Sequence, residues 1–122
     1  MKFVDREQFI KGILLRVRDS AISGTLKSLV EPPGRRPLKE DMVLSEWFNN
    51  LSEQDKEMVK KIIENAVDSS VFGFLAVLDG VRVIEEGPSK GDFELYYVNG
   101  SLRIRLNETD DEYLHDIYQG LK

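Results

Sequence analysis

The residues best suited to acid–base or metal chemistry are the only histidine, His115, and the acids that precede it. Glu112 and His115 have the spacing of half a di-iron helix motif, but such a site needs a second histidine and more glutamates on facing helices. The chain also lacks cysteine, which excludes a thiolate site and a cysteine nucleophile. A contact along one helix face between His115 and Asp111 or Glu112 explains the same spacing. We therefore expect a structural histidine and no metal ion.

Two other features could take part in chemistry. Asp79 is the acid beside the longest apolar run, where burial could tune it, although the end of a helix explains its place more simply. Residues 87–91 form a Gly- and Lys-containing turn, but they lack the spacing and the strand-to-helix frame of a phosphate-binding loop. We expect no catalytic residue and no cofactor. The alternative is an enzyme or small-ligand site near Asp79, His115 and residues 87–91, which would have to line one cavity.

Charge is divided unequally along the chain. Residues 1–39 carry nine Lys or Arg against four Asp or Glu, and the rest carries eight against eighteen. An acidic body disfavours nucleic-acid binding, in which phosphate contacts dominate affinity. The basic segment could pack on the acidic remainder, or one charged face could serve a protein partner. Arg35 and Arg36 lie among three closely spaced prolines at positions 32, 33 and 37. They could form a basic tip that holds a carboxylate or phosphate, or they could belong to a plain connecting loop.

Composition bounds the class of protein. The 122 residues, 41% hydrophobic and 32% charged, predict one soluble domain with a core that needs no disulfides. The longest apolar run is too short to cross a membrane, and the first residues do not have the pattern of a signal peptide. We therefore expect a cytoplasmic protein. Asn50, Asn99 and Asn107 begin Asn-x-Ser/Thr triplets, which we attribute to chance.

Residues 52–80 are expected to organise the fold. Ser52 and Asp55 have the spacing of a helix cap, and the apolar residues that follow recur at helical spacing. Residues 71–78 are almost wholly apolar, which is typical of a helix buried on all sides, and Gly80 can end that helix.

A β-hairpin turning at Asp79-Gly80 is the competing interpretation of residues 71–86. Periodicity cannot separate a buried strand from a buried helix over so few residues. We favour the helix because no Pro or Gly separates its amphipathic first half from residue 71. A single helix of this length should bend or break near residues 68–70 or at Gly73. Residues 81–84 are then a short strand.

Three further helices are predicted. Residues 5–30 are amphipathic, begin at Asp5 and should bend or break at Gly24. A short helix ending near Asn49 places Trp47 among apolar residues at i, i+3 and i+4, so we expect Trp47 in the core. The last helix should begin at Thr109, whose spacing to Glu112 is that of a capping box.

Residues 92–106 carry the clearest local signal. Asn99-Gly100 between two alternating runs predicts a hairpin with these two residues at the turn. That register pairs Glu94 with Arg105 as ions and Tyr96 with Arg103 as a cation–π pair, and it leaves an apolar opposite face. The fold class is therefore α+β, with helices packed on one face of a small antiparallel sheet.

Four strings in the C-terminal half resemble small uncharacterised bacterial proteins. They are residues 72–80 (FGFLAVLDG), 93–95 (FEL), 106–107 (LN) and 113–116 (YLHD). Some families similar to these are suspected immunity proteins, which neutralise a toxin by binding it. The resemblance implies no catalytic residue.

We expect a non-enzymatic protein-binding module, of the bacterial immunity type, with a basic protein partner. A small-ligand protein or enzyme and a homo-oligomeric structural subunit are the alternatives. Nucleic acid and membrane are not expected partners. The residues expected to contact a partner are Arg35, Arg36, Asp79, Glu94, Tyr96, Arg103 and His115.

Overall fold

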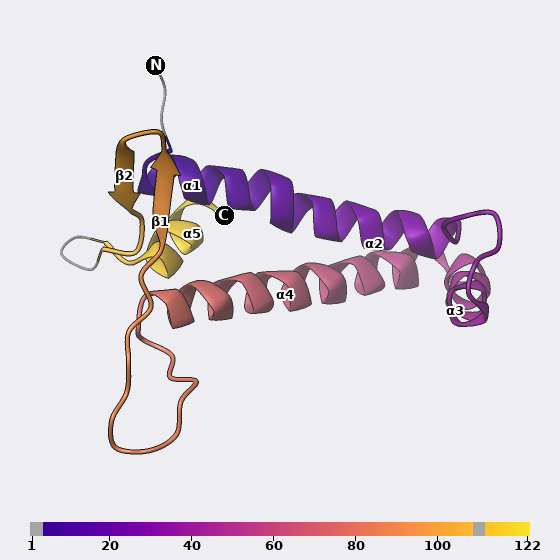
Figure 1. The fold of residues 1–122 in the computed structure, drawn as a ribbon. Coiled ribbons are helices and arrows are strands. Elements are labelled where there is room, and N and C mark those ends of the chain that lie inside the picture. Colours follow the sequence, from indigo (N-terminus) through magenta and orange to yellow (C-terminus); the bar gives the residue numbers. More distant parts are fainter. Residues whose placement is uncertain (1–3, 109–111) are drawn as a thin grey trace. The chain divides into compact units, whose positions relative to one another are not determined.

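The longest element of the fold is one uninterrupted helix. A computed structural model describes residues 4–108 and 112–122, and its helix α4 (Glu53–Leu78) spans 26 residues (Figure 1). The helix prediction for residues 71–78 is confirmed. Of the bend or break predicted near residues 68–70 or at Gly73, the break does not occur. A serine or glycine inside a helix costs about 1 kcal/mol or less, which is too little to end a helix that buries Gly73, Leu75 and Ala76 just beyond this point.

Both ends of α4 are closed by local bonds. Ser52 Oγ accepts the N–H of Asp55 at 3.1 Å, as its spacing predicted. At the other end, the N–H of Val81 donates to Ala76 O at 3.0 Å and that of Gly80 to Val77 O at 3.0 Å. Gly80 has a φ of 77°, so this is a Schellman motif with glycine in the left-handed position.

The apolar end of α4 is buried on one side only. Gly73, Leu75 and Ala76 are buried, whereas Phe74 is 64% exposed. The expectation of a helix buried on all sides is therefore wrong at Phe74. The helix has a core-facing side here and an open side that carries an aromatic ring.

The N-terminal helical segment contains an irregularity where none was expected. It consists of α1 (Arg6–Ile13), the π-helical η1 (Leu14–Asp19) and α2 (Ser20–Val30). Asp5 caps α1 by accepting the N–H of Gln8 at 2.8 Å. Gly24 lies inside α2 without interrupting it, so the predicted break at Gly24 is wrong. The departure from α geometry falls in η1.

Helix α3 (Lys39–Asn49) forms where a short helix was predicted, but it is rotated away from the expected orientation. Ser45 and Phe48 are its buried residues, while Trp47 is 53% exposed. Ser45 Oγ donates to Val30 O at 3.3 Å, and Asn49 Nδ2 donates to the same oxygen at 3.0 Å. These bonds to the end of α2 turn Ser45 and Phe48 inward, so the prediction of Trp47 in the core is wrong.

The predicted hairpin exists with a shifted register. Strand β1 (Tyr96–Asn99) pairs antiparallel with β2 (Leu102–Arg105), with Asn99 opposite Leu102 and Tyr96 opposite Arg105. The turn residues are therefore Gly100 and Ser101, not Asn99 and Gly100. Gly100 has a φ of 61° and no described non-glycine residue has a positive φ, which fits a type II′ turn with glycine first.

The shift moves each pairing by two residues, so every side chain keeps the predicted face. Arg103 now lies diagonal to Tyr96, and its guanidinium carbon is still 4.0 Å from the ring centroid, as predicted. The predicted Glu94–Arg105 ion pair is wrong. Arg105 instead contacts Asn107 Oδ1 at 3.2 Å and Glu108 at 3.9 Å.

Residues 81–84 form no strand, so that prediction is wrong. The N–H groups of Val81 and Arg82 both bond to Ala76 O, which withdraws them from any ladder, and within the described residues the sheet contains only β1 and β2. Helix α5 (Leu114–Leu121) closes the chain, with Tyr113 at its N-cap. The predicted cap at Thr109 lies outside the described residues.

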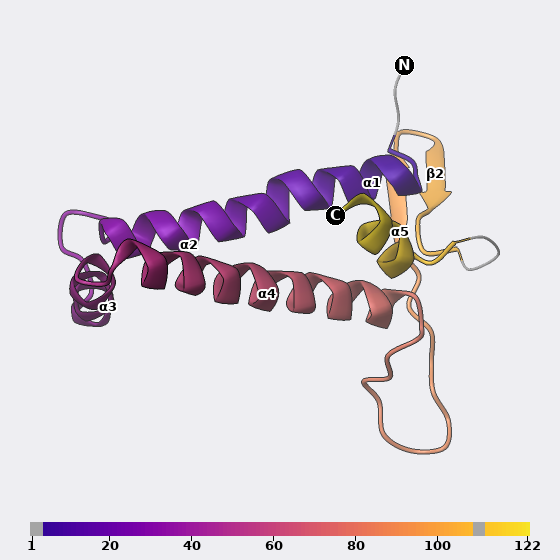
Figure 2. The same ribbon diagram turned by 180° about the vertical axis from the view of Figure 1, so that it is seen from behind.

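The α+β class is confirmed, and the chain divides into two compact units. The first comprises Met1–Val17 and Ser69–Lys122, and Figure 2 shows α1, α5 and the hairpin side by side within it. Its core joins Ile10, Leu75, Leu114 and Tyr118.

The second unit, Arg18–Asp68, contains α2, α3 and the first part of α4. Arg18 Nε lies 2.7 Å from Asp68 Oδ1, so a half-buried ion pair joins the unit's two ends. Within the described residues, no helix combines the length and apolar character needed to cross a membrane.

Candidate functional site

Asp79 and His115, 36 residues apart, meet at the start of α5. The Asp79 carboxylate accepts the backbone N–H of Leu114 at 3.1 Å and that of His115 at 2.9 Å. Its Oδ2 also lies 2.7 Å from His115 Nδ1, and the Asp79 side chain is fully buried. Asp79 thus follows the last residue of α4 in the sequence and caps the N-terminus of α5 with its side chain. The helix dipole of α5 stabilises a negative charge at this position.

The imidazole of His115 is held on several sides. Phe72 meets it edge-on with ring centroids 5.1 Å apart, and Tyr113 stacks on it at 5.2 Å. Its Nε2 lies 3.5 Å from Asp116 Oδ1. Because Asp79 Oδ2 accepts from Nδ1, the hydrogen on that nitrogen fixes the ring's orientation. The pair therefore joins the end of α4 to the start of α5.

The geometry supports a structural use of this pair more than a chemical one. Both Asp79 oxygens are occupied by backbone donors, and the His115 side chain is only 10% exposed. A cavity of about 150 Å³ is lined by residues that include Gly80, Lys90 and Gly91, but by neither Asp79 nor His115. In the described part of the chain, no group of three or more His, Asp or Glu side chains could hold a metal ion.

Asn107 is a second buried polar centre, and sequence reasoning missed it. It is 1% exposed, and its amide donates to Leu78 O and to Phe93 O, each at 2.6 Å. Its Oδ1 accepts the N–H of Leu95 at 2.9 Å and Nε of Arg105 at 3.2 Å. The two N–H donors and both acceptor lone pairs of the amide are therefore used. No spacing in the sequence marks this role, because its partners lie up to 29 residues away.

These two centres hold the ends of one loop. Residues 79–95 connect α4 to β1 outside any helix or strand, and Figure 1 shows them leaving the end of α4 and returning to β1. Asn107 bonds to Leu78 and Phe93, and Asp79 is buried against α5. The loop carries internal contacts as well, among them Glu85 Oε2 to the Gly91 N–H at 2.7 Å and Lys90 Nζ to Gly87 O.

Between its fixed ends the loop is exposed. Residues 80–94 are exposed throughout, and four large apolar side chains stand among them. These four are Val81 (53% exposed), Val83 (57%), Ile84 (63%) and Phe93 (45%). Apolar side chains gathered on an anchored loop are typical of an interaction surface.

The structure brings three of the predicted partner-binding residues together beside this loop. Tyr96 Oη lies 3.1 Å from Glu94 Oε1, and Arg103 covers the Tyr96 ring. Arg35 and Arg36 are exposed in the other unit, between α2 and α3. Asp79 and His115 are buried, and their contacts hold the start of the loop.

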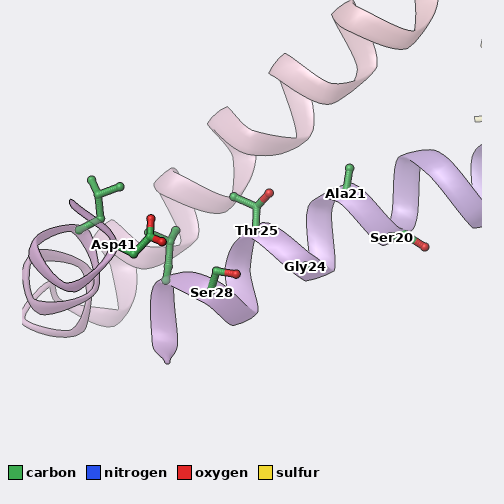
Figure 3. A pocket seen from close by; sticks show the side chains of 8 residues that line it. Ser20, Ala21, Gly24, Thr25, Ser28 and Asp41 are labelled. Carbon is green, nitrogen blue, oxygen red and sulfur yellow. The ribbon is translucent and has the colours of Figure 1, made fainter. Parts of the chain in front are cut away.

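A larger hollow, of about 420 Å³, lies between α2 and α3 in the second unit. Figure 3 shows Ser20, Ala21, Gly24, Thr25 and Ser28 along α2, with Asp41 of α3 near its end. Small side chains and one carboxylate provide few directed contacts for a ligand. The loop of residues 81–93 is therefore the better candidate site.

The chain was compared with protein-family models, with curated proteins and with solved structures, and it shows no significant match to any of them.

Proposed function

We propose that this protein is a non-enzymatic protein-binding module whose recognition element is the loop of residues 81–93. The observation that supports this most directly is the anchoring of an exposed apolar loop by two buried polar centres, Asp79 and Asn107. Loops of this length without secondary structure of their own are commonly functional. A loop already ordered before binding loses less conformational entropy on contact, which raises its affinity.

The loop sequence favours one mode of binding. Three of the four residues in 81–84 are Val or Ile, which pack well in strands, and residues 83–86 run outside any helix or strand. The chain offers these residues no partner strand among those described. We infer that residues 83–86 pair with the edge of a sheet in another protein, where main-chain bonds give affinity and apolar pockets give specificity.

Charge favours a basic partner. Residues 81–94 hold four acids, Glu85, Glu86, Asp92 and Glu94, against Arg82 and Lys90. Complementary charge would speed the encounter and select among partners. An immunity-type protein that neutralises a basic toxin in the bacterial cytoplasm is the finer form of this proposal. Its support is the sequence resemblance together with the acidic loop.

The test is capture of a partner by matched variants. Wild-type protein, Ile84→Asp and Ile62→Asp are immobilised, and lysate of the protein's own host is passed over each at low and then high salt. Ile84 and Ile62 are 63% and 67% exposed, so both substitutions place a carboxylate on equally open surface. We expect a stoichiometric basic protein on wild type and on Ile62→Asp, released by salt and absent from Ile84→Asp. Equal retention by all three, or by none, contradicts the assignment to this loop.

A further inference from the structure

Helix α3 is apolar on the side that faces away from its own core. At about 100° per residue, Val43 lies about 170° and Trp47 about 130° from the mean direction of the buried Ser45 and Phe48. Val43 is 58% exposed and Trp47 53%. Together with Glu46, Asn50 and Leu51 they border a hollow of about 490 Å³. A helix that is apolar on opposite sides is normally covered on both.

The segments that flank α3 carry opposite charges, which indicates what covers this face, although the first turn of the helix also holds the acids Glu40 and Asp41. Arg35 and Arg36 are exposed just before α3, and Lys39 opens it beside Glu40. Just after α3, Glu53 and Asp55 are exposed at the start of α4, where Glu53 pairs loosely with Lys56 at 3.3 Å. If two copies of α3 pack antiparallel, Val43 of one meets Trp47 of the other. The same arrangement brings the Arg35–Arg36 tip of each copy to Glu53 and Asp55 of its partner.

The apolar area is about what a weak dimer needs. A Trp side chain buries at most about 250 Å², so the exposed half of Trp47 offers roughly 130 Å². With Val43, Leu44 and Leu51 each partly exposed, one copy offers on the order of 300 Å² of apolar surface at about 60–120 Å² for a whole aliphatic side chain. Since apolar atoms make up roughly 60% of an interface, two copies would bury about 1,000 Å² in total. This is the lower bound for a specific interface.

We propose that the outer face of α3, formed by Val43 and Trp47 with Leu51 just after the helix and Leu44 at the edge toward α2, is a self-association surface on which a second copy of this chain packs antiparallel. The hydrophobic centre contributes most of the affinity, and the two charged contacts at the ends select the antiparallel orientation over the parallel one. Symmetry makes the surface complementary to itself, as a two-fold dimer requires. This surface lies in the Arg18–Asp68 unit, so the proposal stands independently of the loop of residues 81–93.

The first experiment measures mass and Trp47 emission as protein concentration rises from micromolar to millimolar. Trp47 is the only tryptophan, so its emission reports on this face alone. We expect sedimentation to show a monomer–dimer equilibrium, with emission shifting to shorter wavelength as the dimer forms. Val43→Asp should abolish both changes. Ile62→Asp is the matched control, since Ile62 is 67% exposed on α4 of the same unit, and it should behave as wild type.

The second experiment tests the orientation by charge reversal. Arg35→Glu with Arg36→Glu, and separately Glu53→Arg with Asp55→Arg, should each weaken self-association about tenfold, because four surface ion pairs become repulsive. An equal mixture of the two variants should restore it, since each copy then meets opposite charge. A monomer at every concentration, a Val43→Asp variant that still dimerises, or a mixture that stays monomeric would each overturn the proposal.

Discussion

Replacing Asp79 with Asn tests whether one buried carboxylate joins α4 to α5. The substitution keeps the shape of the side chain but changes one acceptor oxygen into an NH₂ group. If the remaining oxygen stays with His115, the new NH₂ faces the N–H of Leu114, which in the wild-type protein donates to Asp79 Oδ1 at 3.1 Å. Two donors then oppose each other, and the bonds to the backbone N–H and Nδ1 of His115 lose their charge.

The expected cost is about 2–4 kcal/mol of unfolding free energy. A hydrogen bond to a charged group contributes about 1.5–3 kcal/mol, and loss of a helix cap costs about 0.5–2 kcal/mol. The side chain is fully buried, so water cannot replace the lost partners. A domain of this size is stable by only about 5–15 kcal/mol, so the change is a large fraction of the total.

Urea titration followed by circular dichroism measures this cost, and amide hydrogen exchange at Leu114 and His115 locates it. Asp116→Asn is the control, because Asp116 lies in the first turn of the same helix and its side chain is 54% exposed. We expect less than about 1 kcal/mol for the control, as for an exposed charge near a helix N-terminus. A cost below about 0.5 kcal/mol for Asp79→Asn, or unchanged exchange at both amides, would refute this account of the cap.

Three further substitutions test other contacts. Asn107→Ala should cost about 2–4 kcal/mol in urea titration, since it leaves the part-buried carbonyl groups of Leu78 and Phe93 without this donor. Asn107→Asp, whose carboxylate cannot donate, should not restore the lost stability. Gly73→Ala should stabilise the protein by up to about 1 kcal/mol in an Arg82→Ala background but by less in wild type, because the new Cβ would overlap Arg82 Nη1. Ser52→Ala should cost about 1 kcal/mol, measured in the same way, through loss of the α4 cap, and Ser52→Asp should retain most of the stability.

The features that sequence predicts well are those decided by neighbouring residues. Asp5 and Ser52 each bond to an N–H three residues on, and Gly80 takes the left-handed position that ends α4. The cation–π pair of Tyr96 and Arg103 also forms, because a two-residue shift leaves every strand residue on its predicted face. In each case the partner lies within a few residues or across one turn.

The hairpin register shows where local signals lose to distant contacts. Asn99-Gly100 favours a turn at these residues, yet the turn forms at Gly100-Ser101. Asn107 bonds to Phe93 and Leu95, and the N–H of Leu106 donates to Leu95 O at 2.7 Å, which pins the open end of the hairpin. A type II′ turn requires only one residue with positive φ, so it accepts the register set at that end. Asn107 carries no sign of this role in its own neighbourhood.

Helix α3 shows a second limit of prediction from sequence, which concerns the orientation of a helix. Its period reveals which residues are apolar but cannot say which of two apolar sides meets the chain's own core. The hydrogen bond from Ser45 to Val30 O sets which side of α3 faces the core. A serine inside an apolar helix does not by itself predict such a contact. Trp47 is consequently exposed, and the largest apolar side chain of the unit becomes available to a second molecule.

The way the loop of residues 79–95 is anchored explains why its apolar side chains are free. A long loop is usually tied down by burying its own hydrophobic residues, which removes them from any interface. Here a carboxylate and an amide fix the two ends, so Val83 and Ile84 contribute little to holding the loop and remain exposed. Substitutions at these two positions should therefore affect binding far more than stability. Substitutions at Asp79 and Asn107 should affect stability first, and binding only through the position of the loop.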